Sequence, residues 1–232
     1  MRVTSRHARF FARLAPSSHT ADDPPHSLHP APVITAVLYA DLNCPFSYAL
    51  TARLEVLGLM HRCEWRGVQH DPGLPAPPHL GDRRVMRSLE DDVDAVRRMA
   101  ADVAITPPPV KPNTRRAIAA VASVHRQHAP RASAFRRALG AALWVRGEDI
   151  SDGSVINAVA TWSGVPGWVD LDGPAGYRLA DEWDMDWVTR RLGGVPRIVR
   201  PDGRVLWGLV SVEEITEFFG TPLRSSGGFR SE

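Results

Sequence analysis

The residues with the clearest capacity for chemistry are Cys44 and Ser47, three positions apart in the stretch Cys44-Pro-Phe-Ser47. Pro45 cannot continue a strand ladder but suits the first turn of a helix, so Cys44 is predicted to stand at a helix N-terminus. Unpaired backbone N–H groups and the helix dipole stabilise an anion there, which lowers the pKa of a thiol. We therefore predict that Cys44 is a nucleophile near neutral pH. The alternative is a small buried apolar residue.

Ser47 makes this a centre with a single thiol. Its hydroxyl can donate a hydrogen bond to the Cys44 thiolate, but it cannot resolve a mixed disulfide. The second cysteine, Cys63, is expected at the opposite end of the predicted sheet, on the order of 15 Å from Cys44. A disulfide requires Cα atoms within about 7 Å, so we predict that Cys63 is a core residue and that the second thiol comes from another molecule.

The elements that must position Cys44 are predicted to form a β-α-β unit. Residues 33–39 are apolar and β-branched, as in a buried parallel strand. Residues 46–59 carry leucines at helical spacing with Gly58 as a stop, and residues 61–68 form the second expected strand. This order predicts parallel strands joined by a right-handed crossover.

The segment 82–192 is predicted to be mainly helical, and a hairpin and a last helix follow it. The hairpin lies within residues 193–207 and turns at Pro201-Asp-Gly203. Ser211 and Glu214 match a capping box that opens the last helix. The helices expected in the middle segment cover 83–103, 114–128, 131–146, a short stretch from Ser151-Asp152 to Gly164, and 177–192, with 165–176 as a loop.

This order of elements and several short motifs resemble the DsbA-like thioredoxin superfamily. Cys44-Pro-Phe-Ser47 resembles its active-site motif, and Gly194-Val-Pro196 resembles its cis-proline loop. Lys111-Pro-Asn-Thr-Arg-Arg-Ala117 and Gly147-Glu-Asp-Ile-Ser-Asp152 resemble positions in its FrnE-like, kappa-class glutathione transferase and 2-hydroxychromene-2-carboxylate isomerase branches. The resemblance covers roughly residues 33–220. It implies an α/β thioredoxin fold, β-α-β followed by β-β-α, with a large all-helical insertion.

The resemblance also implies how the chain is divided. Residues 33–76 and 193–220 would form the thioredoxin-like domain, and residues 77–192 the helical insertion. Residues 1–32 are rich in Pro, His and Ser and are expected to be a disordered N-terminal extension. The Ser- and Gly-rich residues 221–232 are expected to be a flexible tail.

For function, the resemblance implies a thiol–disulfide oxidoreductase in which Cys44 is the nucleophile and Ser47 stabilises its thiolate. Pro196 would be cis and lie beside Cys44. The backbone N–H and C=O of Val195 would then bind the extended chain of a thiol or disulfide substrate, either a small molecule or a protein. No tightly bound cofactor is expected, and glutathione is the expected cosubstrate. Three neighbours of the centre are expected to contact substrate as well: Asn43, Pro45 and Phe46.

Two alternative functions stay open. Kappa-class transferases and the isomerases carry serine at the position of Cys44, and a Ser-Asp pair after their fourth strand holds the γ-glutamyl end of glutathione. This chain has Leu209 and Val210 there, so a glutathione-dependent transferase or isomerase would lack that polar site. The other alternative is a non-catalytic binding module, in which the groove beside Pro196 holds a peptide and Cys44 is unreactive.

A basic block is the remaining feature with functional meaning. Residues 103–147 contain eight Lys and Arg residues and no acidic residue. Lys111, Arg115 and Arg116 follow a proline-rich break that the resemblance puts near the active site, so they are the predicted anion-binding residues. The alternative is a solvated helix face that acidic residues elsewhere in the chain balance.

Composition argues against several other classes of protein. The formal net charge of +2 gives no indication of nucleic-acid binding, and no apolar run approaches the roughly 18 residues that span a membrane. No metal site is expected, because His125 and His128 lack a third ligand at suitable spacing. Two cysteines without a secretory signal predict a cytoplasmic protein. Analogy with relatives makes a homodimer the expected assembly, if the protein assembles at all.

Overall fold

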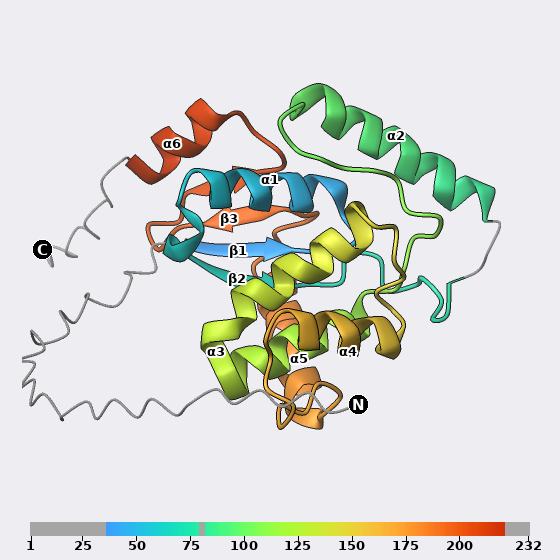
Figure 1. The fold of residues 1–232 in the computed structure, drawn as a ribbon. Coiled ribbons are helices and arrows are strands. Elements are labelled where there is room, and N and C mark those ends of the chain that lie inside the picture. Colours follow the sequence, from blue (N-terminus) through green and yellow to red (C-terminus); the bar gives the residue numbers. More distant parts are fainter. Residues whose placement is uncertain (1–35, 79–81, 221–232) are drawn as a thin grey trace, which may run out of the picture. The chain divides into compact units, whose positions relative to one another are not determined.

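A four-stranded mixed sheet forms the centre of the structure, a computed structural model that describes residues 36–78 and 82–220 (Figure 1). β2 runs parallel to β1, whereas β3 is antiparallel to β1 and β4 is antiparallel to β3. This arrangement confirms the predicted α/β thioredoxin topology. The N-terminal extension, residues 33–35 and the C-terminal tail lie outside the described residues. The strands, in the order β2-β1-β3-β4, are β1 (Ala36–Ala40), β2 (Cys63–Gly67), β3 (Arg197–Val199) and β4 (Val205–Trp207).

The β-α-β unit is confirmed, with α1 (Pro45–Val56) and the short 3-10 helix η1 (Met60–Arg62) between the two strands. The register pairs Ala36 with Cys63 and Ala40 with Gly67. The carboxyl ends of both strands therefore lie at the end of the sheet where α1 begins. The helix ends before Gly58, whose φ of +64° lies in the region that favours glycine.

Four helices make up the insertion between β2 and β3: α2 (Arg83–Met99), α3 (Arg115–Trp144), α4 (Gly153–Trp162) and α5 (Pro174–Thr189). The predicted loop over 165–176 extends too far. The helix α5 already begins at Pro174, because proline suits the first turn of a helix. Gly176 lets α5 approach α3 closely, since a Cβ there would collide with the carbonyl oxygen of Ala119. The boundaries between the thioredoxin-like domain and the insertion stay a prediction.

α3 consists of two helical segments joined at a kink, at the place where the sequence predicted a break between two helices, so that prediction is confirmed. His128 has non-helical backbone angles (φ −153°, ψ 62°), and Pro130 follows within the helix. Proline has no backbone N–H and its ring clashes with the preceding turn, so the helix bends instead of running straight. Both segments have buried residues and pack against the rest of the chain, and the second segment extends to Trp144.

The C-terminal part of the described chain contains the predicted hairpin and last helix. β3 and β4 flank the turn at Pro201-Asp-Gly203, where Gly203 has a φ of +83°. α6 (Val212–Gly220) opens with the predicted capping box. The Ser211 amide donates to Glu214 Oε2 at 3.0 Å, and the Glu214 amide donates to Ser211 Oγ at 3.2 Å.

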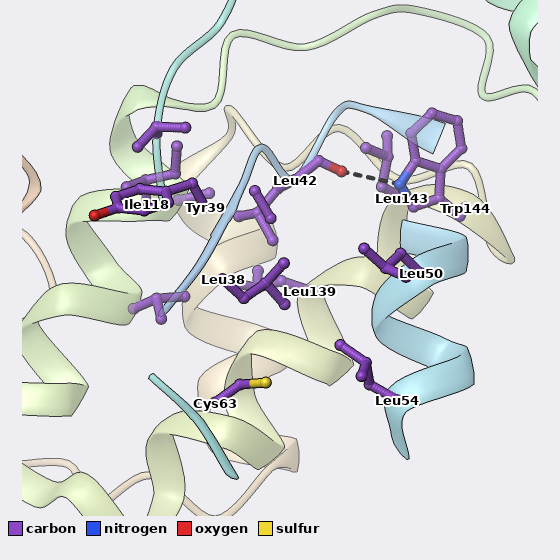
Figure 2. Packing of buried hydrophobic residues seen from close by; sticks show 14 of the residues in the cluster. Leu38, Tyr39, Leu42, Leu50, Leu54, Cys63, Ile118, Leu139, Leu143 and Trp144 are labelled. Carbon is purple, nitrogen blue, oxygen red and sulfur yellow. Dashed lines mark hydrogen bonds between the residues drawn. The ribbon is translucent and has the colours of Figure 1, made fainter. Parts of the chain in front are cut away.

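The hydrophobic core joins the sheet to α1 and α3. Leu38 of β1, Leu50 and Leu54 of α1 and Leu139 of α3 are all fully buried and lie together in Figure 2. The indole Nε1 of Trp144 donates to the carbonyl oxygen of Leu42 at 2.9 Å. This hydrogen bond ties the end of α3 to the loop that precedes Cys44, so the core holds the candidate site in place.

Candidate active site

Cys44 lies at the N-terminus of α1, as the sequence predicts. It is the N-cap residue, with extended backbone angles (φ −95°, ψ 116°), and Pro45 occupies the first turn. The Cys44 amide donates to the carbonyl oxygen of Asp41 at 3.3 Å, and its own carbonyl accepts from the Tyr48 amide at 3.0 Å. A tight turn after β1 therefore delivers the cysteine to the first turn of the helix.

The cis-proline loop lies directly beside this cysteine. The Val195–Pro196 peptide bond is cis, which confirms the prediction for Pro196. The Sγ of Cys44 donates to the carbonyl oxygen of Val195 at 3.7 Å. The carbonyl oxygen of Pro196 accepts from the Gly208 amide at 3.0 Å, which fastens the loop to the segment after β4. The fold thus brings together two motifs that are 151 residues apart.

The prediction of a lowered thiol pKa is wrong for this arrangement. Cys44 is only 6% exposed, and burial raises the pKa of its thiol. The hydroxyl and the amide of Ser47 and the amide of Phe46 oppose this shift, whereas the charge of Asp41 adds to it. Loss of hydration is the largest cause of the shift and outweighs the hydrogen bonds from the first turn of α1. The thiol is therefore protonated at neutral pH.

The sequence analysis missed a pair beside the centre, formed by the buried Asp41 and the half-buried His70. Asp41 is 1% exposed, and its Oδ2 accepts from the His70 amide at 3.0 Å. The Nδ1 of His70 lies 2.8 Å from the same oxygen. The position of Asp41 three residues before Cys44 was a usable signal. No signal in the sequence indicated His70, because it comes close to Asp41 only through the parallel pairing of β1 with β2.

Asn43 and the residues after Cys44 surround the thiol closely. Asn43 is 1% exposed, and its Nδ2 donates to the carbonyl oxygen of Pro112 at 2.8 Å. Its side chain therefore ties the loop to the insertion. Pro45 and Ser47 are also buried, whereas Phe46 is half-buried and packs against the core. The predicted substrate contacts of these residues stay predictions.

The three predicted anion-binding cations each have acidic partners. Lys111 Nζ lies 3.4 Å from Asp71, beside the Pro112 that holds Asn43, and so adjoins the centre. Arg115 pairs with Asp181 and Asp184. Arg116 pairs with Asp172, with Nε to Oδ1 at 2.8 Å. These partners come from other segments of the chain, so the local excess of positive charge is largely balanced in the fold.

The segment after β4 is anchored by a buried arginine that the sequence analysis did not single out. Arg53 of α1 donates to the carbonyl oxygens of Val210 and Met99, both at 2.7 Å, and to Asp102 at 3.1 Å. Leu209 is buried in the core. Leu209 and Val210 therefore supply no side-chain polar group where the family's γ-glutamyl site would be.

Cys63 is a core residue, as predicted. It is 9% exposed, and burial raises the pKa of its thiol to about 12. It pairs with Ala36 at the start of β1, whereas Cys44 follows the other end of that strand. Both cysteines are free thiols.

The described residues also bear on metal binding and on membrane insertion. Within residues 36–78 and 82–220, no group of three or more His, Cys, Asp and Glu side chains is placed to hold a metal ion. The described helices include none that is both long and apolar enough to cross a membrane.

A cysteine at the N-terminus of α1 facing a cis-proline loop places this chain among thioredoxin-fold proteins. The chain belongs to the DSBA-like thioredoxin domain family, whose sequence profile matches residues 35–220. No curated protein matches it.

Three similar solved structures share the fold. A 2-hydroxychromene-2-carboxylate isomerase is 20% identical, with coverage of 80% of this chain and 94% of that chain and a TM-score of 0.61. The probable DsbA oxidoreductase of Streptomyces coelicolor is 19% identical, with coverage of 82% of this chain and 92% of that chain and a TM-score of 0.62. The cytosolic disulfide reductase DsbM of Pseudomonas aeruginosa is 18% identical, with coverage of 80% of this chain and 97% of that chain and a TM-score of 0.61.

Proposed function

We propose that this protein is a thiol–disulfide oxidoreductase with a single active thiol, Cys44. The observation that carries the proposal is the 3.7 Å contact between Cys44 Sγ, at the N-terminus of α1, and the carbonyl oxygen of Val195. It puts a nucleophile next to a backbone segment that can pair with an extended substrate chain. Membership of the DSBA-like family supports this class of chemistry.

The proposed exchange has two balanced steps. Cys44 loses its proton to solvent, and its thiolate attacks one sulfur of a disulfide; the old S–S bond breaks as the new one forms. The other half of the substrate leaves as a thiolate and takes up a proton. The thiolate of an external thiol such as glutathione then attacks the substrate sulfur of the mixed disulfide and forms a new disulfide with it, and Cys44 leaves as a thiolate that takes up a proton. Ser47 cannot perform this second step, because it has no sulfur.

The buried, protonated thiol fits a centre that substrate activates. In this proposal a substrate chain that pairs with Val195 takes the place of the thiol as hydrogen-bond partner of the carbonyl. The freed sulfur then keeps the contacts that lower its pKa, the hydroxyl and amide of Ser47 and the amide of Phe46. The thiolate would thus form mainly when a substrate is present to react with it.

Glutathione is the proposed external thiol. A second structure of the DsbM disulfide reductase, 18% identical and with a TM-score of 0.53, is described as containing GSH. Here Leu209 is buried and Arg53 engages the Val210 carbonyl, so we propose that glutathione reacts at Cys44 without a dedicated γ-glutamyl site. A reducing compartment such as the cytosol, where two free thiols persist, would suit this cycle.

The burial of Cys44 also favours a second candidate, a binding module without redox activity. A thiol that is 6% exposed and bonded to the Val195 carbonyl can serve as a packing residue. The cis-proline loop would then hold a peptide backbone, and Cys44 would stay unreactive in the folded state.

One experiment separates the two candidates. Folded Cys63→Ala protein is incubated with glutathione disulfide at pH 8, and the intact mass is followed before and after addition of reduced glutathione. We expect a mixed disulfide on Cys44 that reduced glutathione removes. The Cys44→Ser, Cys63→Ala protein is the control and should gain no mass. If only urea-unfolded Cys63→Ala protein forms the adduct, the oxidoreductase proposal is overturned and the binding module is favoured.

A further inference from the structure

The kink in α3 creates a cleft at the other end of the sheet from Cys44. The two halves of α3 diverge at His128, beside the edge strand β2, and a cavity of about 340 Å3 lies between them, β2 and α5. This volume falls in the range of small-molecule sites, about 300–1,000 Å3. We name it the kink cleft and define it by Cys63, Trp65, Val121, Ala132, Arg136 and Trp183.

The walls of the kink cleft are largely apolar. The indole rings of Trp65 and Trp183 meet edge to face, with centroids 5.9 Å apart, and Val121 and Ala132 of α3 are buried beside them. His125 and Ser133 lie at the exposed rim. Flat aromatic and small aliphatic surfaces of this kind suit a planar apolar ligand body.

A buried arginine supplies the polar group. Arg136 is 5% exposed and lines both the kink cleft and a smaller cavity of about 170 Å3 that Glu55, Ser47 and Asp41 also line. Its Nη2 donates to Glu55 Oε1 at 2.7 Å, and its guanidinium carbon lies 5.8 Å from the Trp65 ring centroid. A guanidinium has five N–H donors, and within the described chain one hydrogen bond is made. Donors therefore remain for a ligand.

The charges around the kink cleft favour an anion. Burial lowers the pKa of Arg136, the charge of Glu55 opposes this shift, and the neighbouring Arg137 adds to it. The one acidic residue that lines the kink cleft, Glu64, is already bonded to Arg66 at 2.8 Å. A ligand carboxylate would complete the hydrogen bonding of Arg136, since arginine and carboxylate pair through two parallel bonds.

We propose that the kink cleft binds a small aromatic carboxylate, with its anionic group on Arg136 and its ring against Trp65, Trp183 and Val121. This proposal does not rest on the proposed redox function, although Arg136 also lines the smaller cavity that Ser47 and Asp41 reach. Cys63, on the wall of the kink cleft, pairs with Ala36 at the start of β1, whereas Cys44 follows the end of that strand. Cys44 does not line the kink cleft, so an occupant would not cover its thiol.

The proposal is tested by isothermal titration of the full chain with 2-naphthoate, with neutral 2-naphthalenemethanol as the matched compound. We expect naphthoate to bind at one site, at least tenfold more tightly than the alcohol. The Arg136→Met variant should weaken naphthoate binding at least tenfold. Arg126→Met is its matched control, because Arg126 is an exposed arginine that is also in α3 and does not line the kink cleft, and it should bind as the unchanged protein does.

A second variant guards against loss of folding in Arg136→Met. Ser133 is exposed at the rim, so Ser133→Phe should keep the fold and the Arg136–Glu55 pair while it fills the cleft. We expect it to weaken naphthoate binding at least tenfold with an unchanged circular dichroism spectrum. No binding of naphthoate at millimolar concentration, or equal binding by the alcohol or by folded Ser133→Phe protein, would overturn the proposal.

Discussion

The thiol of Cys44 donates to the carbonyl oxygen of Val195 at 3.7 Å, across 151 residues of sequence. The contact joins the start of α1 to the cis-proline loop before β3. Because the thiol is the donor, the contact favours its protonated form, and burial removes water from the sulfur. The reactivity of this centre thus depends on neighbours as much as on the helix N-terminus.

Asp41 is expected to make Cys44 less reactive by raising the pKa of its thiol. Its charge is one cause of the raised pKa of Cys44, so Asp41→Asn should lower that pKa. More thiolate would then be present at a given pH, and alkylation of Cys44 by iodoacetamide at pH 8 should become severalfold faster. The pH profile of alkylation in Cys63→Ala protein measures this. Asp71→Asn, which removes a carboxylate bonded to Lys111, is the control and should leave the profile in place.

Ser47 is expected to act in the opposite direction. Its hydroxyl lowers the pKa of Cys44, so Ser47→Ala should raise that pKa further and slow alkylation at pH 8. Thr51→Ala is a matched control, because the Thr51 hydroxyl donates to the Ser47 carbonyl at 2.7 Å, one turn along α1. The same rate in Ser47→Ala and unchanged protein would show that the hydroxyl does not act on the sulfur.

Cys63 should make the protein less stable in alkaline solution. Burial raises its pKa from 9.0 to about 12, so the thiol ionises in the unfolded chain before it does so in the folded one. The stability contributed by the neutral thiol is then lost as pH rises above 9. Between pH 8 and pH 10 the free energy of unfolding should fall by about 1.4 kcal/mol more with Cys63 present than in the Cys63→Val variant.

Urea unfolding at the two pH values measures this difference. The comparison is between Cys44→Ala protein and the same protein with Cys63→Val, so that the other thiol does not contribute. Tyr39, whose pKa is raised to about 12, is common to both proteins and cancels. Equal pH dependence in the two proteins would refute the assignment of Cys63 as a buried neutral thiol.

Trp144 is expected to support the site through the core. Its indole donates to the Leu42 carbonyl at 2.9 Å, in a fully buried position. Trp144→Phe would leave that carbonyl unpaired and a gap beside it, and should cost about 2 kcal/mol in urea unfolding. Trp162→Phe is the control, because Trp162 is 78% exposed and should change stability by less than about 0.5 kcal/mol.

The local chemistry of the sequence was enough to predict the order of elements and the place of the cysteine. Pro45 marks the start of a helix, Pro201-Asp-Gly203 a turn and Ser211 with Glu214 a cap, because each acts on the backbone within a few residues. Their predictions are confirmed. The family resemblance led to the cis bond at Pro196, which composition alone would not have indicated.

What the sequence could not predict depends on residues that meet from distant segments. The acidic partners of Arg115 and Arg116 lie about sixty residues away, so the basic block looked unbalanced when read along the chain. The break between the two segments of α3 is where the sequence predicted it, but the cavity between these segments, β2 and α5 was not predicted, because it depends on how they pack.

By itself, the sequence determined a cysteine at the first turn of a helix in a thioredoxin-like chain, because the signals for this act locally. The protonation of that cysteine depends on the folded environment of its sulfur. Burial removes water from the sulfur and Asp41 adds a negative charge, and both raise its pKa, whereas the hydrogen bonds from Ser47 and Phe46 lower it. Burial and charge at one atom are sums over neighbours in space, and the order of residues along the chain does not contain them.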